Sequence, residues 1–229
     1  MYCIIGDIHG NIEELQKLLA LLKPGKSDML IFLGDYIDKL PHTKETLALL
    51  EKLSRGYDCI FLKGNHDYVW ERYLIYEDLT RQEFLLQYGG RETLKQFGQE
   101  AQRALEENNI SMLKEMLHSY IKLIEKMEYC YIIEDYLALH AGLLPDQYSQ
   151  YPLVFEERNF FIRPDNIHMK EKYLGTYTLV AGHTHLGKKP TLEEGYINID
   201  LGAGYGKYLC ALLGEKHMLV RSDGKEFLL

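Results

Sequence analysis

The sequence predicts a mixed α/β fold, in which a first part with strands and helices is followed by a region of short strands. Three observations support this prediction. Apolar strands alternate with amphipathic helices over residues 2–62, residues 68–128 carry helical patterns without a strand pattern, and short strands follow one another from residue 129. The length of 229 residues is sufficient for one buried core and short for two full domains, so we expect a single domain over residues 1–229.

The first part of the chain has continuous apolar strands rather than alternating ones. The predicted strands cover residues 2–5, 29–33 and 59–62. Leucines spaced three and four residues apart indicate a helix after the first strand, with Asn11 placed to cap it, and a second helix covers residues 43–54. Because strands without polar alternation are buried on both sides, we expect a parallel sheet that is covered on both faces.

Residues 68–128 are predicted to form an inserted helical cap. Glycines at 89–90 and asparagines at 108–109 divide this stretch into three expected helices. The strand pattern then returns, and a turn at residues 223–224 joins the last two strands. The predicted strands cover residues 129–133, 136–139, 177–181, 196–200, 209–213, 217–221 and 225–229.

The composition restricts the classes of partner. Lys and Arg number 26 against 34 Asp and Glu, which gives a formal net charge of −8 without a basic stripe, so we expect no nucleic-acid binding. No apolar run reaches the ~20 residues that a membrane span requires, and Met1 is followed by an apolar strand without a signal-peptide pattern, so we expect a cytoplasmic protein outside the membrane. The cysteines are scattered without a C-x-x-C pair, which favours reduced thiols. They are Cys3, Cys59, Cys130 and Cys210.

Five groups of metal-type ligands stand at the ends of predicted strands, each beside a glycine. Asp7 and His9 are two residues apart, so their side chains project to the same side of an extended segment. Ligands of open α/β sheets bind at the carboxyl edge of the strands, so we expect the groups to converge there. The alternative is that they are turn residues and satisfied polar side chains. The groups contain Asp7, His9, Asp35, Asp38, Lys39, Asn65, His66, Asp67, His140, His183 and His185.

The ligand types indicate which metals fit. Imidazole, carboxylate and amide ligands together suit Mn²⁺, Fe or Zn²⁺ better than Mg²⁺, which prefers oxygen alone. Five of the nine histidines belong to these groups. The remaining histidines are interpreted as structural or surface residues, and they are His42, His118, His168 and His217.

The order and context of the five motifs resemble the metallophosphoesterase superfamily. More narrowly they resemble its phosphoprotein phosphatase branch, in the small bacterial and phage form that is related to diadenosine tetraphosphate hydrolases. The resemblance covers residues 3–213 apart from most of 68–128, and it includes a glycine-rich stretch at 198–206. It implies a two-sheet β-sandwich flanked by helices. It also implies that a hydroxide bridging two divalent ions, Mn²⁺ first and Fe or Zn²⁺ as alternatives, attacks the phosphate ester in line.

The resemblance also implies a set of metal ligands. Asp7, His9 and Asp35 would hold the first metal, and Asp35 would bridge to the second. The residues implied for the second metal are Asp35, Asn65, His140 and His183. His185 departs from the phosphatase branch, but in the wider superfamily a histidine at this place ligates the first metal, so we assign it there. Its alternative is a surface histidine on a loop.

The resemblance implies that His66 is the general acid. Asp38 would orient it, because a carboxylate fixes the tautomer of an imidazole. The alternative role for Asp38 is a helix cap. Asp67 is interpreted as a supporting or capping residue rather than a catalytic one.

Phosphate recognition departs most from the family pattern. The branch has arginine where this chain has Lys39, and lysine lacks the planar fork of a guanidinium. Arg163 resembles the arginine that bacterial members place after an aromatic segment, with Arg158 as a lower-ranked candidate and a surface position as the alternative for both. Asn65 is included among the candidate phosphate-binding residues.

Two enzymatic functions follow from this resemblance. The first is hydrolysis of phosphoserine and phosphothreonine in proteins, and the second is hydrolysis of nucleotides such as diadenosine tetraphosphate. A non-catalytic binding module is a third, weaker alternative, because all positions for the metal ligands carry competent residues. The net charge of −8 disfavours a long polyanionic substrate.

Overall fold

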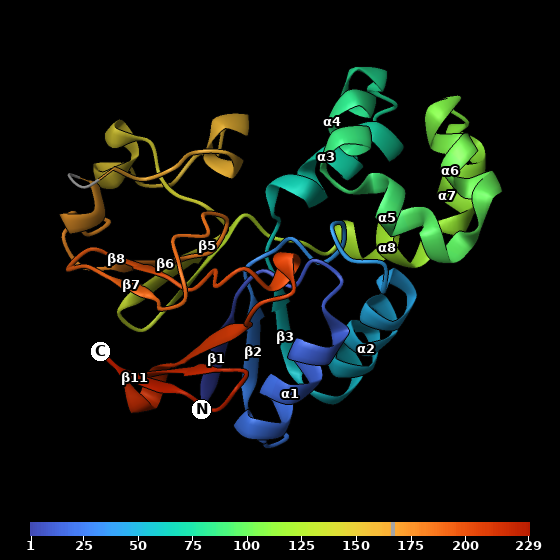
Figure 1. Cartoon of the computed structure of the whole chain (residues 1–229). Helices are drawn as coiled ribbons and strands as arrows, with labels where there is room; N and C mark the ends of the chain where they lie inside the picture. The colour runs from blue at the N-terminus through green and yellow to red at the C-terminus, as the bar shows by residue number, and fades with distance from the viewer. Residues whose placement is uncertain (166–167) are drawn as a thin grey trace.

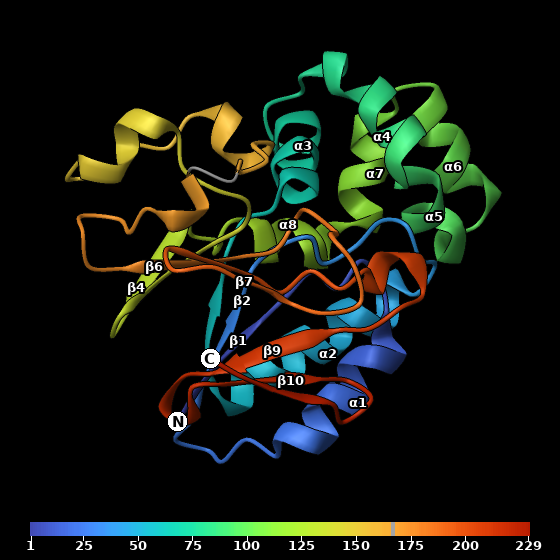
Figure 2. The ribbon, with the colours of Figure 1, turned by 60° about the vertical axis from the view of Figure 1, so that its left-hand side comes forward.

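The computed structural model describes residues 1–165 and 168–229, and its framework is a pair of β-sheets packed face to face (Figures 1 and 2). The first sheet has the strand order β11-β10-β9-β1-β2-β3, and the second has the order β4-β5-β6-β8-β7. The strands are β1 (Tyr2–Ile5), β2 (Met29–Phe32), β3 (Asp58–Phe61), β4 (Cys130–Ile133), β5 (Tyr136–Leu139), β6 (Thr178–Ala181), β7 (Thr191–Leu192), β8 (Tyr196–Asn198), β9 (Cys210–Leu213), β10 (Met218–Arg221) and β11 (Glu226–Leu228).

Helices α1 and α2 cover the outer face of the first sheet, and a set of further helices stands over its upper edge in Figure 1. The α-helices are α1 (Ile12–Leu22), α2 (Thr43–Gly56), α3 (Asn65–Leu74), α4 (Gln82–Tyr88), α5 (Gly90–Leu94), α6 (Gln99–Glu106), α7 (Ile110–Met116) and α8 (His118–Ile124). The short 3₁₀ helices are η1 (Leu79–Arg81), η2 (Lys95–Phe97), η3 (Pro145–Ser149), η4 (Glu157–Phe160), η5 (His168–Lys170), η6 (Ala203–Tyr205) and η7 (Gly214–Lys216).

The prediction of parallel strands that are covered on both faces is confirmed for β1, β2 and β3, whereas β9, β10 and β11 extend the same sheet by antiparallel pairing, so the sheet as a whole is mixed. β1 pairs in parallel with β2, and β2 pairs in parallel with β3. Ile5 packs against the helices, whereas the next residue back, Ile4, packs against the second sheet. Both faces therefore bury apolar side chains, which explains why the strands show no polar alternation.

The sequence located most elements but not their number. Strand bounds agree within one or two residues, and the Asn11 side chain accepts a hydrogen bond from the backbone of Glu14 as predicted for a cap. The prediction of three helices within 68–128 is wrong, because Gly98 at φ +92° and a bend before Asp78 add further breaks. β7 is only two residues long, too short to show a period of two.

The helices from α3 to α8 share a core with α1 and α2. Leu113, Leu117 and Tyr120 belong to the same buried apolar cluster as Leu15 and Leu50. These helices therefore pack on the main body rather than standing apart from it. Among the described residues, no helix combines the length and apolar character needed to cross a bilayer.

Candidate metal centre

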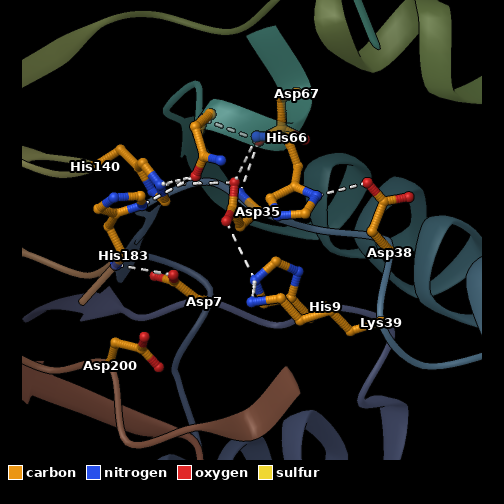
Figure 3. A network of polar contacts seen from close by, with 12 residues as sticks. Asp7, His9, Asp35, Asp38, Lys39, His66, Asp67, His140, His183 and Asp200 are labelled. Atoms are coloured by element: carbon orange, nitrogen blue, oxygen red, sulfur yellow. Dashed lines mark hydrogen bonds and ion pairs between the residues drawn. The ribbon is translucent and has the colours of Figure 1, made fainter. Parts of the chain in front are cut away.

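The five groups of polar residues follow five strands whose carboxyl ends meet at one edge of the sandwich. β1, β2 and β3 supply the groups from the first sheet, and β5 and β6 supply those from the second. β5 and β6 are parallel to one another, as β1, β2 and β3 are, so the strands of each sheet end at a common edge. Figure 3 shows the resulting cluster, with Asp35 at its middle.

Several residues of the cluster have a backbone conformation that L-residues rarely adopt. Such conformations cost about 1–3 kcal/mol each and gather at functional sites, where the surrounding structure holds them. They turn the chain sharply after β1, β2 and β6, so side chains from separate loops can point at one centre. The site residues with positive φ are His9, Asp35, Asp38, Lys39 and His183.

Asp67 ties two of these loops together. Its Oδ2 accepts hydrogen bonds from the backbone N–H of Asp35 at 2.7 Å and of Gly64 at 2.8 Å, and its other oxygen accepts from the hydroxyl of Tyr120. Burial raises the pKa of this carboxyl to about 7. Asp67 thus supports the loops, as the sequence suggested, and its oxygens are occupied by these donors.

The first ligand group contains His9, Asp35 and His66. His9 Nδ1 lies 2.9 Å from the carbonyl oxygen of Ile37, and because a carbonyl can only accept, this nitrogen carries the proton. Burial lowers the pKa of His9, so Nε2 presents a lone pair, 3.1 Å from Asp35 Oδ2. His9 Nε2 and Asp35 Oδ2 are two acceptors that face each other, an arrangement that suits a cation between them. The Lys39 ammonium donates a hydrogen bond to His9 Nε2 at 2.8 Å.

The second ligand group contains Asp35, His140 and His183, and Asn65 joins it. His140 Nδ1 donates to the carbonyl oxygen of Leu33 at 3.0 Å, which leaves its Nε2 as an acceptor 3.0 Å from Asn65 Oδ1. His183 Nδ1 lies 3.0 Å from the same Asn65 oxygen. Burial lowers the pKa of both histidines, that of His183 to about 3, so both rings are in the neutral form that binds metals.

Asp7 provides the clearest sign that a cation belongs here. Its carboxylate is 2% exposed, and Oδ1 has no hydrogen-bond partner among the described residues, while Oδ2 accepts from the backbone N–H of His183 at 2.8 Å. Burial, and then the charges of Asp200 and Asp35, raise the pKa of Asp7. A Cβ at Gly182 would lie 1.8 Å from Asp7 Oδ1, so only glycine leaves room for this oxygen. An unpartnered buried carboxylate oxygen beside neutral imidazoles is a donor set that divalent metals fit.

His66 lies beside the cluster but has a different environment. Its Nδ1 is 2.6 Å from Asp38 Oδ2, and Asp38 also accepts hydrogen bonds from Trp70 Nε1 at 3.0 Å and from the Thr93 hydroxyl. Burial alone would lower the pKa of His66, but the Asp35 charge and the Asp38 hydrogen bond outweigh it, and the pKa is raised. The ring therefore favours the protonated form, which donates protons rather than binding metal.

A pocket with three cationic side chains opens next to the two ligand groups. Its volume is about 340 Å³, and Lys39, Arg163 and Lys207 all line it. Tyr205, which is 63% exposed, also lines it, and the Lys39 ammonium lies 4.8 Å from the centre of the Tyr205 ring. The predicted phosphate-binding residues Lys39 and Arg163 thus lie together at this pocket.

The remaining predicted site residues are His185, which lines the same pocket, Arg158, which lies outside it, and Asn65, which belongs with the second ligand group. The His185 ring is on the rim of this pocket, with Nε2 3.0 Å from the Lys207 ammonium, and it belongs to neither ligand group. Arg158 is bound to Glu156 at 3.1 Å and does not line the pocket. Asn65 directs its amide oxygen at the two histidines of the second group.

The sequence analysis missed several residues that shape the site. Trp70, Thr93 and Tyr120 lie within residues 68–128, and no local motif marks them as partners of Asp38 and Asp67. Asp200 could have been found, since it is a carboxylate just after a strand and beside a glycine-rich turn. It lies near Asp7 in Figure 3.

The chain belongs to the family of calcineurin-like phosphoesterases, whose family model matches residues 2–193. The family's dinuclear metal centre has candidate ligands in the two groups described above. Relatives include bis(5'-nucleosyl)-tetraphosphatase PrpE of Bacillus thuringiensis, 27% identical over 92% of this chain and 89% of its own length. The protein of the same name from Halalkalibacterium halodurans is also 27% identical, over 91% of this chain and 88% of its own.

Solved structures share the fold at lower identity. A crystal structure of a candidate diadenosine tetraphosphatase has a TM-score of 0.64 and 20% identity, covering 96% of this chain and 91% of its own. A protein serine/threonine phosphatase from Saccharomyces cerevisiae has a TM-score of 0.59 and 14% identity, covering 100% and 79% respectively. At these identities the likeness establishes the two-sheet fold.

Proposed function

We propose that this metallophosphoesterase hydrolyses bis(5'-nucleosyl) tetraphosphates. The observation that carries the proposal is the pocket lined by Lys39, Arg163 and Lys207 next to the ligand groups. A phosphomonoester carries about two negative charges, so two metal ions and one arginine would balance it. Three cationic side chains beyond the metal ligands suit a longer chain of phosphates. The names of the bacterial relatives support the same substrate class.

The residues that would hold the metals are those of the two ligand groups apart from His66, together with Asp7 and Asn65. Asp7, His9 and Asp35 would hold one, with Asp35 shared, and His185 stays a proposed addition to the first. The second would be held by Asp35, Asn65, His140 and His183. When bound, two divalent ions supply a nucleophile at neutral pH and neutralise charge on the phosphate. We propose Mn²⁺, because the set mixes nitrogen and oxygen ligands.

The protein's own side chains would orient the phosphate chain and provide the proton. Arg163 and Lys39 would bind phosphate oxygens from the pocket side. His66 would donate its Nε2 proton to the leaving oxygen, because Asp38 already accepts from Nδ1. Asp38 would keep the ring oriented, since Trp70 and Thr93 fix the carboxylate itself.

Hydrolysis of phosphoserine and phosphothreonine in proteins is the second candidate. The ligand groups and the His66–Asp38 pair would act on any phosphate ester, and the first interpretation of the sequence favoured this function. The cationic pocket and the relatives' names support the nucleotide more directly. The non-catalytic alternative is disfavoured, because a buried, oriented general acid has no use in a binding module.

A substrate panel with the manganese-loaded protein tests the proposal. It compares diadenosine tetraphosphate, a phosphothreonine peptide and p-nitrophenyl phosphate by kcat/KM at equal enzyme concentration. We expect the highest value for the dinucleotide. A higher value for the peptide would reverse the order of the two candidates.

We also propose a cytoplasmic location. All four cysteines are free thiols, and burial raises the pKa of Cys3, Cys59 and Cys130 to about 11 and that of Cys210 to about 12. Unpaired thiols suit a reducing compartment. Their raised pKa values favour the protonated thiol over the nucleophilic thiolate, which agrees with a hydrolytic mechanism.

A further inference from the structure

A row of aromatic rings begins at the general acid. The Phe84 ring meets the His66 ring edge on, with 5.3 Å between the ring centres. The centre of the Phe84 ring lies 4.7 Å from that of Tyr88 and 6.1 Å from that of Phe161. We call Phe84, Tyr88 and Phe161 the aromatic wall. Phe84 and Phe161 are half-buried, whereas the Tyr88 side chain is 53% exposed.

The aromatic wall is fixed relative to the reacting groups. Phe84 and Tyr88 both lie on α4, which is followed by Gly89. Gly89 packs so closely on the loop of Asp38 and Lys39 that a Cβ on it would lie 2.4 Å from the backbone nitrogen of Lys39. Phe161 precedes Arg163 by two residues, so the wall is also joined to a proposed phosphate ligand. The aromatic wall is therefore connected to His66 by the ring contact of Phe84, to the loop of Asp38 and Lys39 through Gly89, and to Arg163 along the chain.

The position of His66 determines which part of a substrate reaches this wall. Asp38 occupies Nδ1, so a leaving oxygen must lie within hydrogen-bond distance of Nε2. His9, a candidate metal ligand, touches the His66 ring at 4.8 Å and lies toward the metal positions. A departing group that turns away from the metals would therefore meet Phe84, which contacts the His66 ring as His9 does.

We propose that the aromatic wall stacks the nucleobase of the departing half of a dinucleoside polyphosphate, an inference that rests on the proposed function. In the hydrolytic step a water oxygen bonds to phosphorus, the bond from phosphorus to the leaving oxygen breaks, and His66 gives its proton to that oxygen. Ribose separates this half's phosphate from its base, so the base lies beyond the first ring. Tyr88 presents the exposed ring for it there, and base–aromatic stacking contributes about 1–3 kcal/mol, which is roughly 5- to 150-fold in affinity.

The test uses an internal competition. A mixed substrate, adenosine tetraphosphouridine, is hydrolysed in ¹⁸O-labelled water, and the unlabelled product identifies the half that departed. Purines stack more strongly than pyrimidines, so Tyr88→Ser should lower the ratio of departing adenosine to departing uridine by about threefold or more. Because both products arise in one reaction, the ratio does not depend on how much protein is folded.

Two further variants complete the experiment. Tyr88→Phe keeps the ring and should keep the wild-type ratio. Tyr76→Ser removes a tyrosine of similar exposure, 60%, which lies two residues beyond the C-terminal end of α3, and should not change the ratio. An equal ratio in Tyr88→Ser and wild type would overturn the inference while leaving the proposed function intact. A wild type that releases no nucleotide from the mixed substrate would overturn both.

Discussion

The loops at the strand ends and the helical region of residues 68–128 build the same site in different ways. The loops carry every candidate metal ligand except Asn65, which begins α3, and several of their residues have rare backbone conformations. The helical region carries no candidate ligand, but Trp70 and Thr93 bind the Asp38 carboxylate, which pairs with His66, and Tyr120 binds the Asp67 carboxylate, which ties two loops together. The comparison shows that the reactive groups come from the sheets, whereas their orientation depends on the helices.

The largest loss of activity is expected from a substitution of Asp35, which lies at the centre of the loops at the strand ends. Asp35→Asn removes the carboxylate shared by both ligand groups, so both metals should be lost. Activity should fall by at least about 100-fold. Loss of a residue that only hydrogen-bonds to a metal ligand already lowers metal affinity or activity by roughly 10- to 100-fold, and loss of a ligand itself should cost more. Metal analysis and kcat/KM measure the effect. Asp58→Asn, at an exposed position, is the control, and full metal content in Asp35→Asn would contradict the assignment of the bridge.

The next effect separates proton donation from metal binding. His66→Ala should keep its metals, because His66 favours the protonated state, but lose the general acid. Such proton transfer contributes about 100- to 10,000-fold, and it matters most when the leaving group is poor. Turnover of an alkyl phosphate should therefore fall further than turnover of p-nitrophenyl phosphate.

An equal fall on both esters, with normal metal content, would refute the role of His66 as the acid. His118→Ala changes an exposed histidine outside the cluster and is the control, with wild-type activity on both substrates expected.

The smallest effect tests the helical region. Thr93→Val removes the hydroxyl that donates to Asp38, so the pair of Asp38 and His66 loses orientation. We expect about a 10-fold loss of kcat with metal content unchanged. The free energy of unfolding should also fall by about 1–3 kcal/mol, because the buried backbone N–H of Asp38 loses the Thr93 hydroxyl as its acceptor and the carboxylate keeps Trp70 and His66 as its donors.

The matched control is another buried threonine. Thr46 has a hydroxyl without a hydrogen-bond partner among the described residues, so Thr46→Val should preserve both activity and stability. If Thr93→Val behaved like Thr46→Val, the helical region would have no part in orienting the acid.

From the sequence alone we could predict all strands except β7, the parallel pairing of β1, β2 and β3, and the residues of the five motifs. These follow from local rules: apolar runs form buried strands, and polar residues after glycine-bounded strand ends collect at one edge. Asp200 obeys the same rule, so the sequence contained its signal as well. The substrate was not determined in this way, because the motifs describe chemistry at phosphorus and contain no information about the group attached to it.

Only the tertiary structure decided which side chains support and surround those motifs. Thr93 lies 55 residues from Asp38, and Tyr120 lies 53 residues from Asp67, so their contacts leave no periodic or local pattern in the chain. The pocket of Lys39, Arg163 and Lys207 likewise brings together three distant segments. Such contacts form because packing of the helices on the shared core places them there, and packing depends on the whole set of buried side chains rather than on any one stretch.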